Sequence, residues 1–207
     1  VTVIDGASNQ VVATVEVGKE PCALCYNPLD NKVYSANRYS DDVTVIDGAT
    51  NQVVAIVEVG EKPYALCYNP LDNKVYSANR NSDDVTILDG ASNQAVATVR
   101  VGNWPYALCY NPLDNKVYSA NRGSDDVTVL DGASNQVVAT VEVAHYPYAL
   151  CYNSLDNKVY SANYWSDDVT VLDGATNQVV ATVQVDSAPC ALCYNSLDNK
   201  VYSANYR

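Results

Sequence analysis

A unit of 42 residues recurs almost five times along this chain, and this repetition constrains the fold more strongly than any other feature. Of the 42 positions, 29 carry the same residue in every copy that includes them. A repeat of this length is typical of solenoids and propellers, in which each unit buries its apolar surface against its neighbours. The units span residues 1–42, 43–84, 85–126, 127–168 and 169–207.

Each unit contains four short runs with the pattern of β-strands and no run with a helical period. The runs are rich in Val and Tyr, which are favoured in strands, and Gly, Pro, Asn and Asp separate them, as in turns. Four strands in each unit predict one blade of a β-propeller. In the first unit the runs cover residues 1–5, 11–17, 22–27 and 32–37.

Three sequence runs resemble a known repeat family. NKVYSAN, DDVTVIDGATNQVVATV and GxxPxAL are similar to the YVTN-type propeller repeats of prokaryotic surface-layer-like proteins, and the similarity extends over the whole chain. The run VYSAN departs from the family pattern, because it carries Ser-Ala where Val-Thr is typical. The resemblance implies that the first strand of each blade follows the Pro of GxxPxAL and lines a central channel. It also implies a cell-surface or extracellular location, while the seven cysteines leave the compartment undecided.

We therefore predict a single all-β domain over residues 1–207, a five-bladed β-propeller with four antiparallel strands in each blade. The closing blade would be shared between the two ends of the chain, with strands 190–195 and 200–205 pairing with strands 1–5 and 11–17. This arrangement would leave no open sheet edge, and open edges promote aggregation. The predicted blades are 22–59, 64–101, 106–143, 148–185, and 190–205 with 1–17.

The differences between copies are concentrated at one end of the predicted blades. Neighbouring strands run antiparallel, so the turns after the first and third strands lie at one end and the loops after the second and fourth lie at the other. The first end, which reads (P/S)LDN and GA(S/T)NQ, is nearly invariant. We call it the invariant face, and we call the other end, formed by positions 18–22 and 38–39 and their copies, the varied face. Two interpretations stay open: the varied face recognises a ligand, or it tolerates any residue while the invariant face needs fixed turn chemistry.

Aromatic and basic side chains gather on the varied face. Both tryptophans, Trp104 and Trp165, lie there, with seven of the 17 tyrosines. Tyr, Trp and Arg above a rigid scaffold are typical of recognition surfaces, because they combine large contact area with hydrogen-bonding groups. The predicted ligand-binding residues are Lys19, Glu20, Cys22, Arg38, Tyr39, Tyr64, Arg80, Trp104, Tyr106, Arg122, His145, Tyr146, Tyr148, Tyr164, Trp165, Cys190 and Tyr206.

Net charge narrows the range of partners. The formal charge is −12 at pH 7, and binding to phosphate-rich partners requires a basic footprint. We therefore expect no nucleic-acid partner and no binding to anionic membranes. The apolar runs have the length of strands, which argues against membrane insertion. We expect a monomer that binds a carbohydrate, a protein or a peptide and uses no cofactor.

Other residues with potential chemistry are interpreted as structural. Five of the seven cysteines repeat at one position and fit small buried apolar residues. Cys22 and Cys190 replace a Tyr of the other copies. Each precedes a second Cys by three residues, and residues so spaced in a strand point to opposite faces, so neither pair predicts a metal site. Cys22 and Cys190 could instead face each other near the channel mouth, because their blades are neighbours in a closed ring.

The single histidine and the recurrent acids are also weak candidates for chemistry. We interpret His145 as a contact residue, because one histidine supports neither a catalytic triad nor a histidine metal site. The repeated pair Asp41 and Asp42 is expected to bind backbone amides rather than a cation.

Three functional hypotheses follow from the sequence. The preferred one is a non-enzymatic recognition module that binds its ligand through the varied face. The second is a ligandless scaffold, recently amplified or designed, because near-identical copies give consistent folding information. The third is a lactonase-like enzyme, which rests on fold-level analogy alone, since the varied positions near the channel supply Cys and Tyr rather than carboxylates or His.

Overall fold

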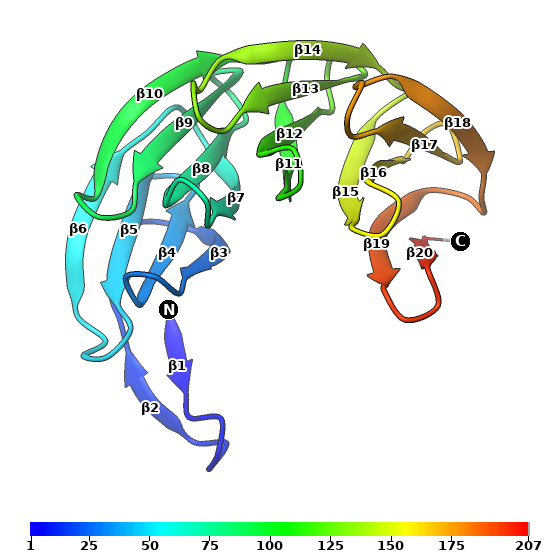
Figure 1. The fold of residues 1–207 in the computed structure, drawn as a ribbon. Helices are drawn as coiled ribbons and strands as arrows, with labels where there is room; N and C mark the ends of the chain where they lie inside the picture. The colour runs from blue at the N-terminus through cyan, green and yellow to red at the C-terminus, as the bar shows by residue number, and fades with distance from the viewer. Residues whose placement is uncertain (207) are drawn as a thin grey trace.

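The computed structural model describes residues 1–206, and twenty β-strands form the regular structure of this part of the chain (Figure 1). Four complete blades each contain four antiparallel strands. Blade 1 consists of β3 (Pro21–Asn27), β4 (Lys32–Asn37), β5 (Asp42–Asp47) and β6 (Val53–Glu58). Blade 2 consists of β7 (Pro63–Asn69), β8 (Lys74–Asn79), β9 (Asp84–Asp89) and β10 (Gln94–Arg100).

The other two complete blades repeat this order. Blade 3 consists of β11 (Pro105–Asn111), β12 (Lys116–Asn121), β13 (Asp126–Asp131) and β14 (Val137–Glu142). Blade 4 consists of β15 (Pro147–Asn153), β16 (Lys158–Asn163), β17 (Asp168–Asp173) and β18 (Val179–Gln184). Two hairpins complete the chain: β1 (Thr2–Ile4) with β2 (Val11–Thr14), and β19 (Pro189–Asn195) with β20 (Lys200–Asn205).

The predicted all-β propeller with four antiparallel strands in each blade is confirmed. The register repeats between blades, so that Tyr34 is paired with Val45 in blade 1 and Tyr118 with Val129 in blade 3. The first and third strands begin one residue earlier than predicted, for example at Pro21 and Asp42. Four blades and two halves are consistent with the predicted count of five.

Apolar side chains fill the space between neighbouring blades. Tyr34, Val43 and Val45 of blade 1 form one fully buried cluster with Val75 and Leu88 of blade 2. Equivalent clusters join blade 2 to blade 3 and blade 3 to blade 4. Burying each such side chain stabilises the fold by about 1.5–3 kcal/mol. Because a blade packs on both of its faces, its strands are apolar on both sides.

The cysteines at the repeated scaffold position lie beside these clusters. Cys25 and Cys67 are partly buried and pack against Tyr34 and Tyr76 and their neighbours. Burial raises the pKa of Cys25 to about 11 and that of Cys109 to about 12. These thiols therefore stay neutral at physiological pH, as expected of apolar core residues.

Hydrogen bonds between blades explain why the invariant face does not vary. Asn27 Nδ2 donates to Asn73 Oδ1 in the next blade at 2.8 Å. Lys32 Nζ donates to the Gly90 carbonyl oxygen at 2.7 Å and to Asn93 Oδ1 at 2.9 Å. The same bonds recur in the following blades. Constant residues on this face thus have a structural cause, and their constancy alone is no argument for function on the other face.

In one respect the structure corrects the prediction: the two half-blades do not pair. β1–β2 and β19–β20 are separate two-stranded sheets at the two ends of an open arc (Figure 1). Ile4 is 63% exposed, although its equivalent Leu88 is fully buried. Tyr202 is 52% exposed, although its equivalent Tyr34 is fully buried. Identical contacts between successive blades set one spacing along the arc, and at that spacing five units leave the ends apart.

Residues 1–206 contain no helix with the length and hydropathy that a membrane-spanning helix requires.

Candidate functional site: an aromatic and cationic cluster on the varied face

The loops after the second and fourth strands lie on the same face, as the antiparallel order of the strands predicts. The amide nitrogen of Arg122 donates to the Trp104 carbonyl oxygen at 3.0 Å, and that of Tyr164 donates to the Tyr146 carbonyl oxygen at 2.9 Å. Equivalent bonds recur at the other blades. Each loop that enters a blade is therefore tied to the loop between the second and third strands of the same blade.

Invariant acids of the preceding blade hold these loops. Asp41 Oδ1 accepts a hydrogen bond from the amide of Lys62 at 2.8 Å, and Asp125 Oδ1 accepts one from the amide of Tyr146 at 2.8 Å. The expected binding of backbone amides is confirmed for Asp41 and its copy Asp125, whereas Asp42 accepts a hydrogen bond from the side-chain amide of Asn37 at 2.6 Å. Lys62 and Tyr146 have φ angles of 53° and 67°, in the left-handed region that costs a non-glycine residue about 1–2 kcal/mol. The carboxylates thus fix a backbone conformation that presents the side chain of Tyr146 on the varied face.

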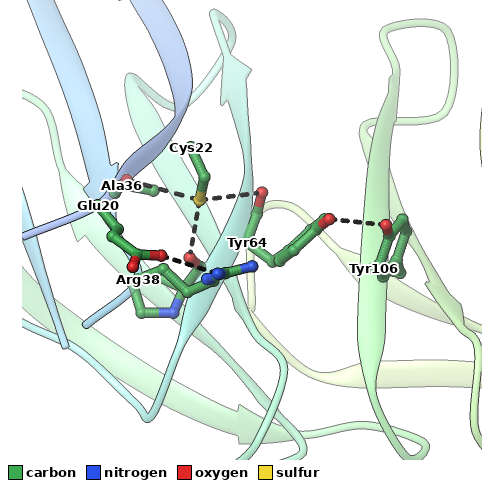
Figure 2. Close-up of polar contacts among 7 residues, drawn as sticks. Glu20, Cys22, Ala36, Arg38, Tyr64 and Tyr106 are labelled. Atoms are coloured by element: carbon green, nitrogen blue, oxygen red, sulfur yellow. Dashed lines mark hydrogen bonds and ion pairs between the residues drawn. The ribbon is translucent and has the colours of Figure 1, made fainter. Parts of the chain in front are cut away.

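Three tyrosines form a connected row at the starts of the inner strands. The hydroxyl groups of Tyr64 and Tyr106 are 2.7 Å apart (Figure 2). Tyr106 donates to Tyr148 at 3.0 Å. Their ring centroids are 4.2 and 4.6 Å apart. Burial, followed by the hydrogen bonds to Tyr148 and Tyr64, raises the pKa of Tyr106 well above its ordinary value. Tyr106 therefore stays a neutral phenol, which can both donate and accept hydrogen bonds.

Arg122 lies over two tyrosines of this row and over Tyr146 of the neighbouring loop. Its guanidinium carbon is 3.9 Å from the ring centroid of Tyr146, 4.7 Å from that of Tyr106 and 5.3 Å from that of Tyr148. Contacts of this kind stabilise a cation by about 0.5–2 kcal/mol each. Tyr146 also stacks on Trp165, with centroids 3.7 Å apart and planes inclined by 8°. The cation and the rings therefore form one continuous cluster over blades 3 and 4.

Two open pockets border the cluster. The larger has a volume of about 460 Å³, and its lining consists of Arg122, Tyr148, Tyr164, Cys190 and Tyr206. The second, of about 330 Å³, shares Tyr164 and Tyr206 with it and adds Trp165, Asp167, Ser187 and Ala188. The two are thus neighbours at the end of the arc where β19 follows blade 4. All residues that line the larger pocket are among those that the sequence predicted.

The remaining predicted residues form a second group toward the N-terminal end of the arc. Arg38 forms an ion pair with Glu20 at 2.8 Å (Figure 2). Arg38 and Lys62 lie 5.2 and 5.6 Å from the ring centroid of Tyr39. Lys19 belongs to the same loop as Glu20, and its amide donates to Ser40 Oγ at 2.9 Å. A charge of each sign is therefore present here.

Three predicted residues, Arg80, Trp104 and His145, lie outside both groups. Arg80 is 5.4 Å from the ring centroid of Trp104, so the two form an isolated cation–aromatic pair. His145 Nδ1 is 2.7 Å from Asp125 Oδ2, and its imidazole is largely exposed. Asp125 is the copy of Asp41 in the third unit, one of the recurrent acids expected to bind backbone amides. Its contact with His145 was not predicted.

Cys22 and Cys190 do not meet, which corrects the suggestion that they face each other. Cys22 Sγ donates to the Pro63 carbonyl oxygen at 3.2 Å, beside Tyr64 (Figure 2). Cys190 Sγ contacts the Ala204 carbonyl oxygen at 3.5 Å. The open arc leaves the two thiols at opposite ends of the tyrosine row. No group of three or more His, Cys, Asp or Glu residues within residues 1–206 is arranged to hold a metal ion.

Comparison with known proteins agrees with the architecture. A family model described as a YNCE-like beta-propeller matches residues 26–205. The structure is similar to Kuenenia stuttgartiensis hydrazine synthase, with a TM-score of 0.80, 21% sequence identity, and coverage of 92% of this chain and 57% of that chain. It is also similar to a functionally unknown protein from Desulfotomaculum acetoxidans DSM 771, with a TM-score of 0.83, 12% identity, and coverage of 99% and 68%. At these identities the likeness concerns the fold alone. A search of curated proteins found no match.

Proposed function

We propose that this chain, which belongs to the YNCE-like β-propeller family, is a non-enzymatic recognition module that binds a carbohydrate on its varied face. The observation that carries this proposal is a cluster beside an open pocket of about 460 Å³. In this cluster Arg122 lies over the rings of Tyr106, Tyr146 and Tyr148. Aromatic rings bind the apolar face of a sugar, and phenol groups exchange hydrogen bonds with its hydroxyls. The YVTN-like runs agree with such a role at a cell surface.

The arrangement of the varied residues supports recognition over simple tolerance of change. If these loops merely tolerated any residue, their side chains would be expected to lie apart in solvent. Instead Tyr146 contacts both Arg122 and Trp165, and Tyr148 lies 5.5 Å from Tyr164 between ring centroids. Residues from different loops thus converge on one place, which is what a binding site requires.

The pocket chemistry favours binding over turnover. Its lining consists of a cation, three phenols and a thiol. Glycoside hydrolysis commonly uses a pair of carboxylates, one on each side of the scissile bond, and this lining supplies none. The side chains are suited to hold a sugar in place.

An array that carries glycans and peptides tests the proposal. The purified chain is compared with a variant in which Trp104, Tyr146, Trp165 and Tyr206 are all changed to Ala. We expect a specific glycan signal that the variant loses, because its stacking surface is gone. The matched control changes exposed leucines of the invariant face to Ala, namely Leu29, Leu71, Leu113 and Leu155.

The outcomes of the array separate the hypotheses. Circular dichroism must first show that both variants keep their strands. A glycan signal that persists in the cluster variant would refute the proposed site. A signal from peptides alone would replace the carbohydrate with a protein partner, and a blank array would support the ligandless scaffold.

A further inference from the structure

The Arg122 guanidinium has donors that the protein leaves unused. Its Nε is buried and has no hydrogen-bond partner among the described residues. The two ion pairs found in residues 1–206 join Arg38 to Glu20 and His145 to Asp125, so Arg122 belongs to neither. A buried donor without a partner costs about 1–3 kcal/mol relative to a satisfied one. Arg80 Nε is buried without a partner in the same way, so this feature belongs to the repeat position. What distinguishes Arg122 is that its side chain also lines an open pocket.

We propose that the pocket beside Arg122 is specific for a carboxylated sugar, whose carboxylate accepts hydrogen bonds from this guanidinium. The inference rests on the proposed function and names the ligand class of the same site. Planar guanidinium and carboxylate groups match each other, because two parallel N–H groups can donate to the two oxygens. Stacking on Tyr146 occupies a face of the guanidinium, and because Nε is buried, the terminal N–H groups are those left for the ligand.

Local charge supports an anionic group at this place despite the overall charge of −12. Among the described residues 1–206, Arg122 is the only charged residue in the lining of the larger pocket. Elsewhere on the varied face Arg38 is paired with Glu20, and His145 is paired with Asp125. An anion that enters this open pocket therefore meets a cation that is in no ion pair with another described residue. The pocket can discriminate an acidic sugar from a neutral one.

The rest of the lining supports a sugar as the bearer of the carboxylate. Tyr148, Tyr164 and Tyr206 provide aromatic surface and hydroxyl groups. The volume of about 460 Å³ lies in the range of small-molecule sites. A uronic acid has a ring with an apolar face, several hydroxyls and one carboxylate, so it can use all three features. An acidic peptide would use the cation but would not need the converging rings.

Calorimetric titration with a matched pair of sugars tests the inference. The probes are an oligogalacturonate and the same oligosaccharide with its carboxylates methyl-esterified. We expect the acid to bind about 10- to 100-fold more tightly than the ester, as for a hydrogen-bonded charge pair. Arg122→Gln should remove this preference, and Arg122→Lys should restore only part of it, because an ammonium lacks the planar fork.

Arg80→Gln is the matched control. Arg80 occupies the equivalent position in the preceding blade, and its Nε is likewise buried without a partner among the described residues. It stacks only on Trp104 and does not line the pocket. We expect Arg80→Gln to bind the acid within about twofold of the original chain, since no ligand contact is lost.

Each outcome has a defined meaning. Equal binding of acid and ester overturns the inference and leaves the proposed carbohydrate function intact. Failure of both probes, with no glycan bound on the array, overturns both. A sulfated neutral sugar or a glutamate-rich peptide that binds as tightly as the acid, with the same dependence on Arg122, overturns the assignment to a carboxylated sugar.

Discussion

Equivalent residues acquire different roles from their surroundings. Arg80 and Arg122 occupy the same repeat position, and both have a buried Nε. Arg80 lies over one tryptophan, whereas Arg122 lies over three tyrosines and lines a pocket. The difference comes from Tyr146, which replaces the Trp104 of the preceding loop. Sequence reasoning identified both arginines as candidates, but it could not rank them, because the ranking depends on contacts between loops.

Cysteines at one repeat position also differ in burial, and they should therefore differ in reactivity. Burial raises the pKa of Cys109 to about 12 and raises that of Cys67 well above its ordinary value. Both thiols should therefore be protonated and protected at pH 8. Cys193, the equivalent residue of the half-blade β19–β20, is exposed. We expect a thiol-labelling reagent to modify Cys193 at least tenfold faster than Cys109, with peptide mass mapping as the readout.

Similar labelling rates at the two positions would contradict the environments described here. Protection of Cys193 to the level of Cys109 would show that another segment covers the half-blade in solution. Labelling in denaturant, where all seven thiols should react, is the control.

At the scale of the element, hydrogen bonds from one blade to the next order the varied loops. Asp83 Oδ1 accepts from the amide of Trp104 at 2.9 Å, as Asp125 Oδ1 does from that of Tyr146 at 2.8 Å. These loops therefore keep the same backbone although their side chains differ. Constant backbone with changing side chains is the arrangement that lets a scaffold carry different sites.

Loss of one such bond should affect binding without touching the ligand pocket. We expect Asp125→Ala to lower the free energy of unfolding by about 1–3 kcal/mol, because the amide of Tyr146 loses its acceptor. The left-handed backbone at Tyr146 would relax, and the affinity for the ligand would fall. Urea denaturation and calorimetry measure the two effects.

Asp83→Ala is the control for this prediction. It removes the equivalent bond, to Trp104, so it should lower stability by a similar amount. Affinity should change little, since Trp104 does not line the larger pocket. The same loss of affinity in both variants would indicate a general loosening of the blades and would contradict a positioning role specific to Asp125.

Much at this scale could be predicted from the sequence. Alternating runs and turn residues placed most strand ends to within one residue, although β2 ends at Thr14, three residues before the predicted end. The antiparallel order of the strands predicted that Arg38 and Glu20 lie on one face. The tyrosine row was less accessible. Tyr64, Tyr106 and Tyr148 recur at a fixed interval, but their hydroxyl contacts depend on the distance between blades, which is set by packing and not by local pattern.

Whether the five units form a closed ring or an open arc depends on the packing between blades and cannot be predicted from the repeat period. Five units suggested a closed ring, because the two terminal hairpins supply complementary strands. Closure depends on the angle between neighbouring blades, and interlocking clusters such as Tyr34 with Val75 and Leu88 fix this angle. The structure is therefore an arc with half-blades at its ends (Figure 1). The exposed side chains of Ile4 and Tyr202 follow directly from this geometry.

We propose that the two faces of the arc have different roles, one structural and one in recognition. Inter-blade bonds such as that from Lys32 to Gly90 occupy the invariant face. The cluster around Arg122 occupies the varied face, over blades 3 and 4. We propose that the molecule binds its ligand at this cluster.

Tryptophan fluorescence during ligand titration tests this claim most directly, because both tryptophans, Trp104 and Trp165, lie on the varied face. Trp165 lines the second pocket and stacks on Tyr146, whereas Trp104 pairs with Arg80 away from the larger pocket. We predict a saturable emission change that Trp165→Phe abolishes and Trp104→Phe retains. A ligand that binds by calorimetry while the emission of Trp165 stays unchanged would place the site elsewhere and contradict the account.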